Sequence, residues 1–272
     1  MGPDALILSA HTVAAAGFLS RVEAAAAAGY AGIGMRPSYY RAARADGASD
    51  AELRSILDDH GVQVAEIEVL GDWALGGERG ARSREYEEKL YGMAAALGGR
   101  HMIVNSELEG PIEQTAERFG AVCDRAAEYG LLVGIEFLPW TSLPDAATAW
   151  EIAMIADRPN GGVLVDTWHH YRGSADAGQL LAIPGEKVVA VHFNDADEKP
   201  VGDLLDDTLH RRRLPGDGAF PLVDFVRLLD GMGVQVPYSV EVISDELAEL
   251  PATEAALKAA EKTRQVFALA RR

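Results

Sequence analysis

The sequence predicts an α/β fold, the (β/α)₈ TIM barrel. Apolar runs typical of buried strands alternate with amphipathic runs typical of helices from one end of the chain to the other. This alternation favours a parallel sheet with right-handed crossovers, and eight strand–helix pairs in roughly 250 residues match the barrel. A doubly wound open sheet is the main alternative. The first predicted strand, however, is not followed by the GxGxxG loop that is usual in that fold.

Eight short apolar runs are the predicted strands. A glycine recurs just before these runs, and glycine is the residue that usually ends a helix. The strands are expected near residues 5–10, 31–36, 62–70, 101–106, 131–137, 162–168, 188–194 and 236–242.

Helices are predicted between these strands. The segment 49–61 shows the pattern, because it opens on a Ser or Asp cap and closes on Gly61. The connection from Asp195 to about Phe220 is unusually long, and long loops in compact domains are often functional. No break in composition indicates a second domain, so residues 1–272 are expected to form one barrel. The other helices are expected near 18–29, 84–99, 112–130, 144–157, 174–182, 220–233 and 252–270.

The composition limits the classes of partner. The formal net charge is −17, from 25 Lys and Arg against 42 Asp and Glu. Nucleic acid and anionic membrane surfaces require a basic face, so neither is expected as a partner. The chain has no apolar run of about 18 residues and no signal-type start. Its lone Cys123 excludes an intramolecular disulfide. We therefore expect a cytoplasmic protein, and a homo-oligomer stays open.

Four consecutive strands end in an acid or a histidine, namely Glu136 in VGIEF, Asp166 in VLVDT, His192 in VAVHF and Glu241 in YSVEV. Ionisable groups are costly to bury unless their charges are compensated. In TIM-barrel enzymes the catalytic groups lie at these strand ends. One divalent metal ion would compensate all four. A carboxylate-rich set with one histidine favours Mn²⁺, with Mg²⁺, Co²⁺ or Zn²⁺ as alternatives.

The order Glu, Asp-x-x-His, His, Glu on strands five to eight resembles the xylose isomerase-like superfamily. Sugar phosphate isomerases and epimerases, inosose and dehydroshikimate dehydratases, and endonuclease IV belong to this superfamily. The segments DTWHHYRG, VHFNDA, RRRLPGDGAFPL and YSVEV carry the likeness across the C-terminal half of the chain. The N-terminal half is similar in organisation only.

The resemblance implies roles for individual residues. Glu136 and Glu241 would bind the metal and also exchange protons on opposite faces of the substrate. Asp166 would be a ligand only. His169 would hold a substrate oxygen, and Arg212 would contact substrate oxygens, with its two arginine neighbours as alternatives if the register differs.

Three further residues are candidates near the substrate. Arg36, at the end of the second strand, could contact an acidic substrate group. Glu68 ends the third strand and could orient a ligand by a hydrogen bond. Trp168 could form a wall of the pocket. The run Arg211–Arg213 in so acidic a chain also indicates an anionic or oxygen-rich ligand, since arginine binds such groups bidentately.

The resemblance implies a metal-dependent isomerase or epimerase. Its substrate would be a small polyhydroxylated carbonyl compound, such as a sugar, cyclitol or keto-polyol, and protons would move through a metal-stabilised enediolate. The alternative is a lyase or dehydratase that uses the same enediolate and expels a leaving group. An endonuclease IV-like DNA repair enzyme is a remote alternative, because strands three and four lack the histidines which that family places at their ends.

Overall fold

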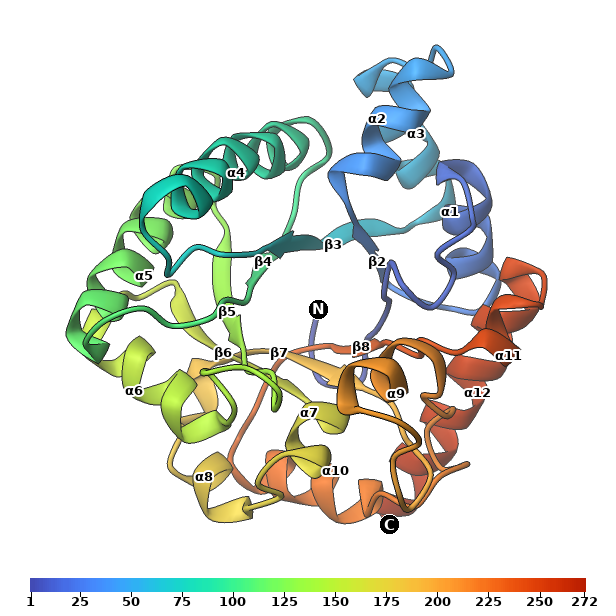
Figure 1. Ribbon diagram of the computed structural model, residues 1–272. Helices are drawn as coiled ribbons and strands as arrows, with labels where there is room; N and C mark the ends of the chain where they lie inside the picture. Colours follow the sequence, from blue (N-terminus) through green and yellow to red (C-terminus); the bar gives the residue numbers. More distant parts are fainter.

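The computed structural model, which describes residues 1–272, confirms the TIM barrel. Eight parallel strands pair in sequence order, and the pairing of the first with the last closes the sheet. The helices form a ring around the strands (Figure 1). The strands are β1 (Leu6–Leu8), β2 (Gly32–Met35), β3 (Gln63–Leu70), β4 (His101–Val104), β5 (Leu132–Glu136), β6 (Gly161–Asp166), β7 (Val188–Phe193) and β8 (Tyr238–Val240).

Ten helices connect the strands, and α11 and α12 follow β8. Helix α1 packs against α12, so the ring of helices closes as the sheet does. A short 3₁₀ turn, η1 (Gly185–Lys187), precedes β7. The helices are α1 (Phe18–Ala27), α2 (Pro37–Ala45), α3 (Asp50–His60), α4 (Gly77–Leu97), α5 (Ile112–Ala127), α6 (Ala146–Ala156), α7 (Thr167–Arg172), α8 (Ala177–Leu181), α9 (Leu204–His210), α10 (Leu222–Gly231), α11 (Asp245–Ala248) and α12 (Ala252–Ala270).

Local capping explains why α3 lies where the sequence predicts it. The Ser49 hydroxyl accepts a hydrogen bond from the Glu52 amide, and the Glu52 carboxylate accepts one from the Ser49 amide. This reciprocal pair satisfies two amides that the first turn leaves free. Gly61 ends the helix at φ 65°, a left-handed conformation that glycine adopts without strain.

The structure adds four short helices to the prediction: α2, α7, α9 and α11. Pro37 occupies the first position of α2, where its missing N–H breaks no helical hydrogen bond. The long connection after β7 contains α9, and Asp203 caps that helix by accepting from the Asp206 amide. Strands β1 and β8 are shorter than predicted, because the chain leaves the ladder at Ser9 and Glu241.

The buried apolar side chains form two clusters. A cluster of 66 buried apolar residues forms the main core, and it includes the outward-facing side chains of the strands. A separate small cluster, Ile103, Leu164 and Ala190, lies apart from it. Leu164 and Ala190 each precede an ionisable residue by two positions, so they share its face of the strand. The ionisable residues therefore lie above an apolar layer inside the barrel.

No helix of the structure combines the length and the apolar character that a membrane span requires.

Candidate metal centre

The four strand-end residues come together at the C-terminal mouth of the barrel. Glu136 and Asp166 are the last residues of β5 and β6, His192 is the penultimate residue of β7, and Glu241 follows β8 directly. Asp166 and His192 are also partners in the register of β6 with β7. One ligand atom of each residue lies within 4.8 Å of the others, and all four side chains are buried.

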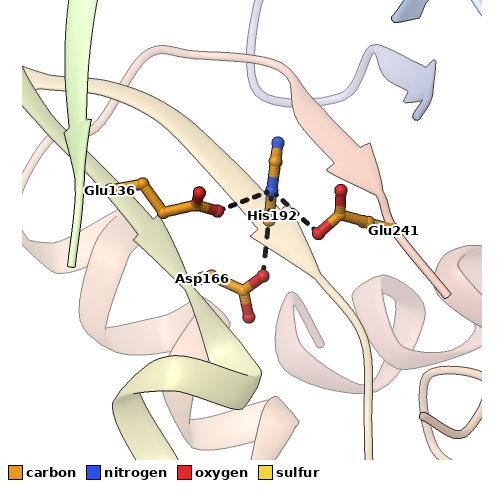
Figure 2. A group of neighbouring side chains, drawn as sticks. All are labelled: Glu136, Asp166, His192 and Glu241. Carbon is orange, nitrogen blue, oxygen red and sulfur yellow. Dashed lines mark ion pairs between the residues drawn. The ribbon is translucent and has the colours of Figure 1, made fainter. Parts of the chain in front are cut away.

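The three carboxylates surround one nitrogen of His192. Its Nδ1 atom is 3.5 Å from Oε1 of Glu136, 3.7 Å from Oδ2 of Asp166 and 3.2 Å from Oε2 of Glu241. Figure 2 shows Glu136 and Glu241 on opposite sides of the imidazole, with Asp166 between them. This nitrogen is buried and has no hydrogen-bond partner. Such an arrangement of one free imidazole nitrogen and three oxygens suits a divalent cation.

In each carboxylate, one oxygen accepts hydrogen bonds from groups around the centre, and the other faces His192. Oε2 of Glu136 accepts from the Asn105 amide group at 3.0 Å. Oε1 of Glu241 accepts from the Ser9 hydroxyl at 3.1 Å. Oδ1 of Asp166 accepts from the Trp168 amide, the His169 amide and the Asn194 side chain. These bonds orient the second oxygen of each residue, as outer hydrogen bonds do in metal sites.

Glu66 fixes the imidazole of His192. Its Oε1 atom is 3.2 Å from Nε2 of His192 and 3.3 Å from Nε2 of His101, and its Oε2 accepts from the Ser239 hydroxyl at 2.7 Å. A carboxylate accepts only, so Nε2 of His192 carries a proton and Nδ1 is left free for a metal. A Cβ atom on Gly34 would lie 2.1 Å from Oε1 of Glu68 and 3.1 Å from Oε2 of Glu66, so glycine makes room for both glutamates.

The charges of the centre are strongly coupled. Burial alone would lower the pKa of His192, but the carboxylates of Glu241, Glu66 and Glu136 raise it well above its usual range. Burial would raise the pKa of Glu241, but His192 and Arg212 hold it well below its usual range. The carboxylates therefore favour a positive charge at Nδ1 of His192, and a metal ion would take the place of a proton on that atom.

Of the three consecutive arginines, only Arg212 points into the centre. Its Nη1 atom donates to Asp166 Oδ2 and to Glu241 Oε2, both at 2.9 Å. The Thr208 hydroxyl accepts from its Nε and Nη2 atoms. Arg211 and Arg213 pair with Asp206 and Asp197 nearer the surface, because side chains of an extended segment alternate in direction.

Asp195 holds the loop that carries Arg212. Its carboxylate accepts from the amides of Gly216, Gly218 and Phe220 at 3.0 to 3.1 Å. The backbones of Asp195 and Arg213 also exchange two hydrogen bonds. The tight LPGDG turn is therefore held against the segment that follows β7, and Arg212 lies over the carboxylates.

His169 lies at the edge of the centre, with Nε2 at 3.7 Å from Glu136 Oε1 and 3.8 Å from Asp166 Oδ2. Trp168 is fully buried, and its ring packs edge-on against His169 and under the guanidinium of Arg212. Trp168 thus lies behind these two side chains. The neighbouring His170 is buried against Tyr171 and Phe225, away from the four strand-end residues.

A second group lies on the opposite side of Glu241. The His11 Nδ1 atom is 3.2 Å from Glu241 Oε1 and 3.6 Å from Glu68 Oε2. Arg36 contacts Nε2 of the same imidazole at 2.8 Å. Burial raises the pKa of Glu68 to about 7, and the charges of Glu66 and Glu241 act in the same direction. The His11 imidazole therefore connects Glu241 to Glu68 and Arg36, two residues that the sequence marked as candidates.

Sequence reasoning missed the polar residues that support the centre from the first half of the chain: Ser9, His11 and Asn105. Each lies just after a strand, as the four predicted residues do. That position was the available signal. Ser and Asn are common in the turns that follow strands, so their position alone does not distinguish a functional residue from a turn residue.

Two groups of enzymes are similar to this chain in sequence. It is 29% identical to 3-dehydroshikimate dehydratase of Pseudomonas aeruginosa over 253 residues, which are 89% of this chain. It therefore spans only 39% of the length of that dehydratase. It is 28% identical to inosose isomerase of Bacillus subtilis over 175 residues, which cover 64% of this chain and 60% of that enzyme.

Solved structures share the fold. The zinc-bound IolI protein superposes with a TM-score of 0.87 at 22% identity, over 96% of this chain and 97% of the other. A fusion of a xylose isomerase-like TIM barrel with a 4-hydroxyphenylpyruvate dioxygenase superposes with a TM-score of 0.88 at 21% identity, over 98% of this chain and 43% of the fusion. The model of the xylose isomerase-like TIM barrel family matches residues 22–266, and the chain belongs to that family.

Proposed function

We propose that the protein is a metal-dependent isomerase or epimerase of a small polyhydroxylated carbonyl compound. One observation carries the proposal: Glu136 and Glu241 lie on opposite sides of His192, and each turns one oxygen toward the space between them (Figure 2). Two carboxylates placed in this way can reach opposite faces of a substrate carbon. The similarity to inosose isomerases agrees with this chemistry.

Glu136, Asp166, His192 and Glu241 are the residues that would hold the metal, with Mn²⁺ as the preferred ion and Mg²⁺, Co²⁺ or Zn²⁺ as alternatives. A bound divalent cation would polarise the substrate carbonyl and acidify the neighbouring C–H bond.

The protein's own residues would then move the proton and hold the substrate. One of the two glutamates removes the proton from the carbon, and the carboxyl group of the other delivers a proton to the opposite face. His169 and Arg212 hold substrate oxygens, and Trp168 fixes both from behind. Glu68 orients the first loop through the Ala10 amide, which donates to it at 3.1 Å.

Proton exchange with solvent tests this proposal. Wild-type protein loaded with Mn²⁺ is incubated with a keto-polyol in D₂O, and deuterium incorporation is followed by NMR. Glu241→Gln is expected to abolish turnover while it still binds metal at least weakly. The matched control is Glu85→Gln, which makes the same change on an exposed face of α4. Full activity in Glu241→Gln would contradict the proposal.

A lyase is the second candidate, and the match to 3-dehydroshikimate dehydratase over 89% of the chain favours it. The same proton removal would then be followed by loss of a leaving group in place of proton return. Mass spectrometry separates the two outcomes, since an isomerase conserves the substrate mass and a dehydratase lowers it by one water. No observation favours DNA repair, because β3 and β4 end near Glu68 and Asn105 and not near histidines.

A further inference from the structure

We propose that Arg36 binds the carboxylate of an acidic substrate, so that the preferred substrates are polyhydroxylated carbonyl acids and not neutral sugars. This inference rests on the proposed function and specifies the substrate class for the same site.

Arg36 lies at the mouth of the barrel, at the end of β2. It directly follows β2, which pairs with both β1 and β3, and its guanidinium contacts the His11 imidazole, whose other nitrogen faces Glu68. The proposed metal ligands come from β5 to β8, so Arg36 belongs to the other half of the same mouth. Its contact with His11 places it one side chain away from Glu241. A substrate held by Glu241 would extend toward this half.

No acidic side chain pairs with the guanidinium of Arg36. Arg212, the other arginine of the mouth, donates to two carboxylates at 2.9 Å. Arg36 forms no ion pair, and the one hydrogen-bond partner of its guanidinium is His11. The chain has 42 Asp and Glu residues, so acidic partners for an arginine are abundant. An arginine that lacks such a partner at this position leaves its charge available to a ligand.

The contact with His11 supports that conclusion. Arginine can only donate hydrogen bonds, so Nε2 of His11 must accept, and the proton of the imidazole lies on Nδ1, toward Glu241. The imidazole holds the guanidinium in place without neutralising it. Arg36 is partly exposed, and none of its nitrogen atoms is both buried and unpartnered, so its remaining N–H groups can reach a ligand. These groups fit a carboxylate bidentately.

The start of α2 favours a carboxylate over a phosphate. Pro37, the first helical residue, has no N–H, and the amides of Tyr39 and Tyr40 already donate to the Arg36 carbonyl. The helix therefore adds few free donors to the guanidinium. One cation with so few further donors suits a singly charged group better than a phosphate, which carries close to two charges near neutral pH.

The test measures binding to the Mn²⁺-loaded protein by calorimetry. The ligands are two acid and neutral pairs, shikimate with its methyl ester and glucuronate with glucose, and inorganic phosphate serves as a competitor. The variants are Arg36→Gln and Arg36→Lys. Arg41→Gln is the matched control, because it removes the same charge from the exposed side of α2, where Arg41 has no partner. Thermal unfolding checks that each variant is folded.

In the wild type, the acid of at least one pair should bind more tightly than its neutral partner. Arg36→Gln should weaken the binding of that acid by about 10- to 100-fold, the usual effect of losing a hydrogen bond between charged groups. Binding of the neutral partner should not change. Arg36→Lys should fall between the two, since it keeps the charge and loses the bidentate geometry. Arg41→Gln should match the wild type.

Three results would overturn the proposal: no preference for either acid, an Arg36→Gln effect no larger than that of Arg41→Gln, or tighter binding of inorganic phosphate than of both acids. If one of these three results is found while Glu241→Gln still abolishes turnover of a neutral keto-polyol, this inference fails and the proposed function stands.

Discussion

The two halves of the barrel contribute different kinds of group to one centre. Strands β5 to β8 supply the four side chains that face it, Glu136, Asp166, His192 and Glu241. Elements β1 to β4 supply the groups that hold three of those four in place. Ser9 donates to Glu241, Glu66 accepts from His192, and Asn105 donates to Glu136.

One half of the barrel therefore provides the residues that would bind the metal, and the other half provides most of the residues that orient them. A side chain in the second half can contact a metal directly, whereas a side chain in the first half acts through the bond it makes to a ligand. Asp166 is the exception, because its supporting bonds come from Trp168, His169 and Asn194 of its own half. Substitutions in the two halves should therefore differ in size and in kind.

The largest effect is expected in the second half. Asp166→Asn should lower metal affinity and turnover by more than the roughly 10- to 100-fold that is usual for residues outside the ligand shell. The charge lost faces the centre directly. Metal content after dialysis and the rate of deuterium exchange measure the two quantities. The control is Asp197→Asn, which removes a half-exposed carboxylate paired with Arg213. Equal metal content in both variants would show that Asp166 is not a metal ligand.

A smaller effect is expected from Glu66, the principal support of His192. Glu66→Gln can still accept a hydrogen bond, but it loses the charge that makes His192 a better ligand. Metal affinity should fall by about 10- to 100-fold. Titration with Mn²⁺, followed by electron paramagnetic resonance, measures it, and Glu85→Gln provides the control. An affinity unchanged from the wild type would show that the first half does not orient the ligands.

Asn105→Ala and Ser9→Ala compare the supports of the two proposed proton-transfer groups. Each removes one hydrogen bond, so metal affinity should fall only about fivefold, the equivalent of roughly 1 kcal/mol. The effect of Ser9→Ala should be the smaller of the two, because Glu241 keeps its contacts to His11 and Arg212. A larger loss in Ser9→Ala would reverse the ranking derived from these contacts. Ser174→Ala, on the exposed surface, is the control.

The smallest effect concerns His170, which lies beside the centre in sequence but not in space. Burial lowers its pKa from 6.5 to about 4. The folded protein therefore binds this proton less readily than the unfolded chain does. Its contribution to stability is present above pH 6.5 and is lost as the pH falls toward about 4. Urea unfolding should show wild-type stability falling relative to His170→Phe over this window, with turnover equal at pH 7. A difference in stability that does not vary with pH would refute this.

The sequence was informative where a residue could be recognised from its immediate neighbours in the chain. An acid or histidine at the end of an apolar strand is costly, so Glu136, Asp166, His192 and Glu241 could be picked out without the structure. The alternation of strands and helices likewise predicted the barrel, because each apolar run requires a partner to cover it.

Pairwise contacts between distant segments could not be predicted. Ser9 and Glu241 are 232 residues apart, and Glu66 and His192 are 126 residues apart. Nothing in either local segment specifies such a partner. The choice of Arg212 among three arginines also depended on the turn that Asp195 holds, which is a tertiary contact. The short helix α2 was missed because Pro37 is equally common in loops.

The most direct test of the central claim is a crystal structure of the protein soaked with Mn²⁺, with anomalous diffraction recorded near the manganese edge. We expect one strong anomalous peak, coordinated by Glu136, Asp166, Glu241 and the Nδ1 atom of His192. A peak between His11, Glu68 and Glu241 instead, coordination through Nε2 of His192, or the absence of any peak in the barrel would contradict it.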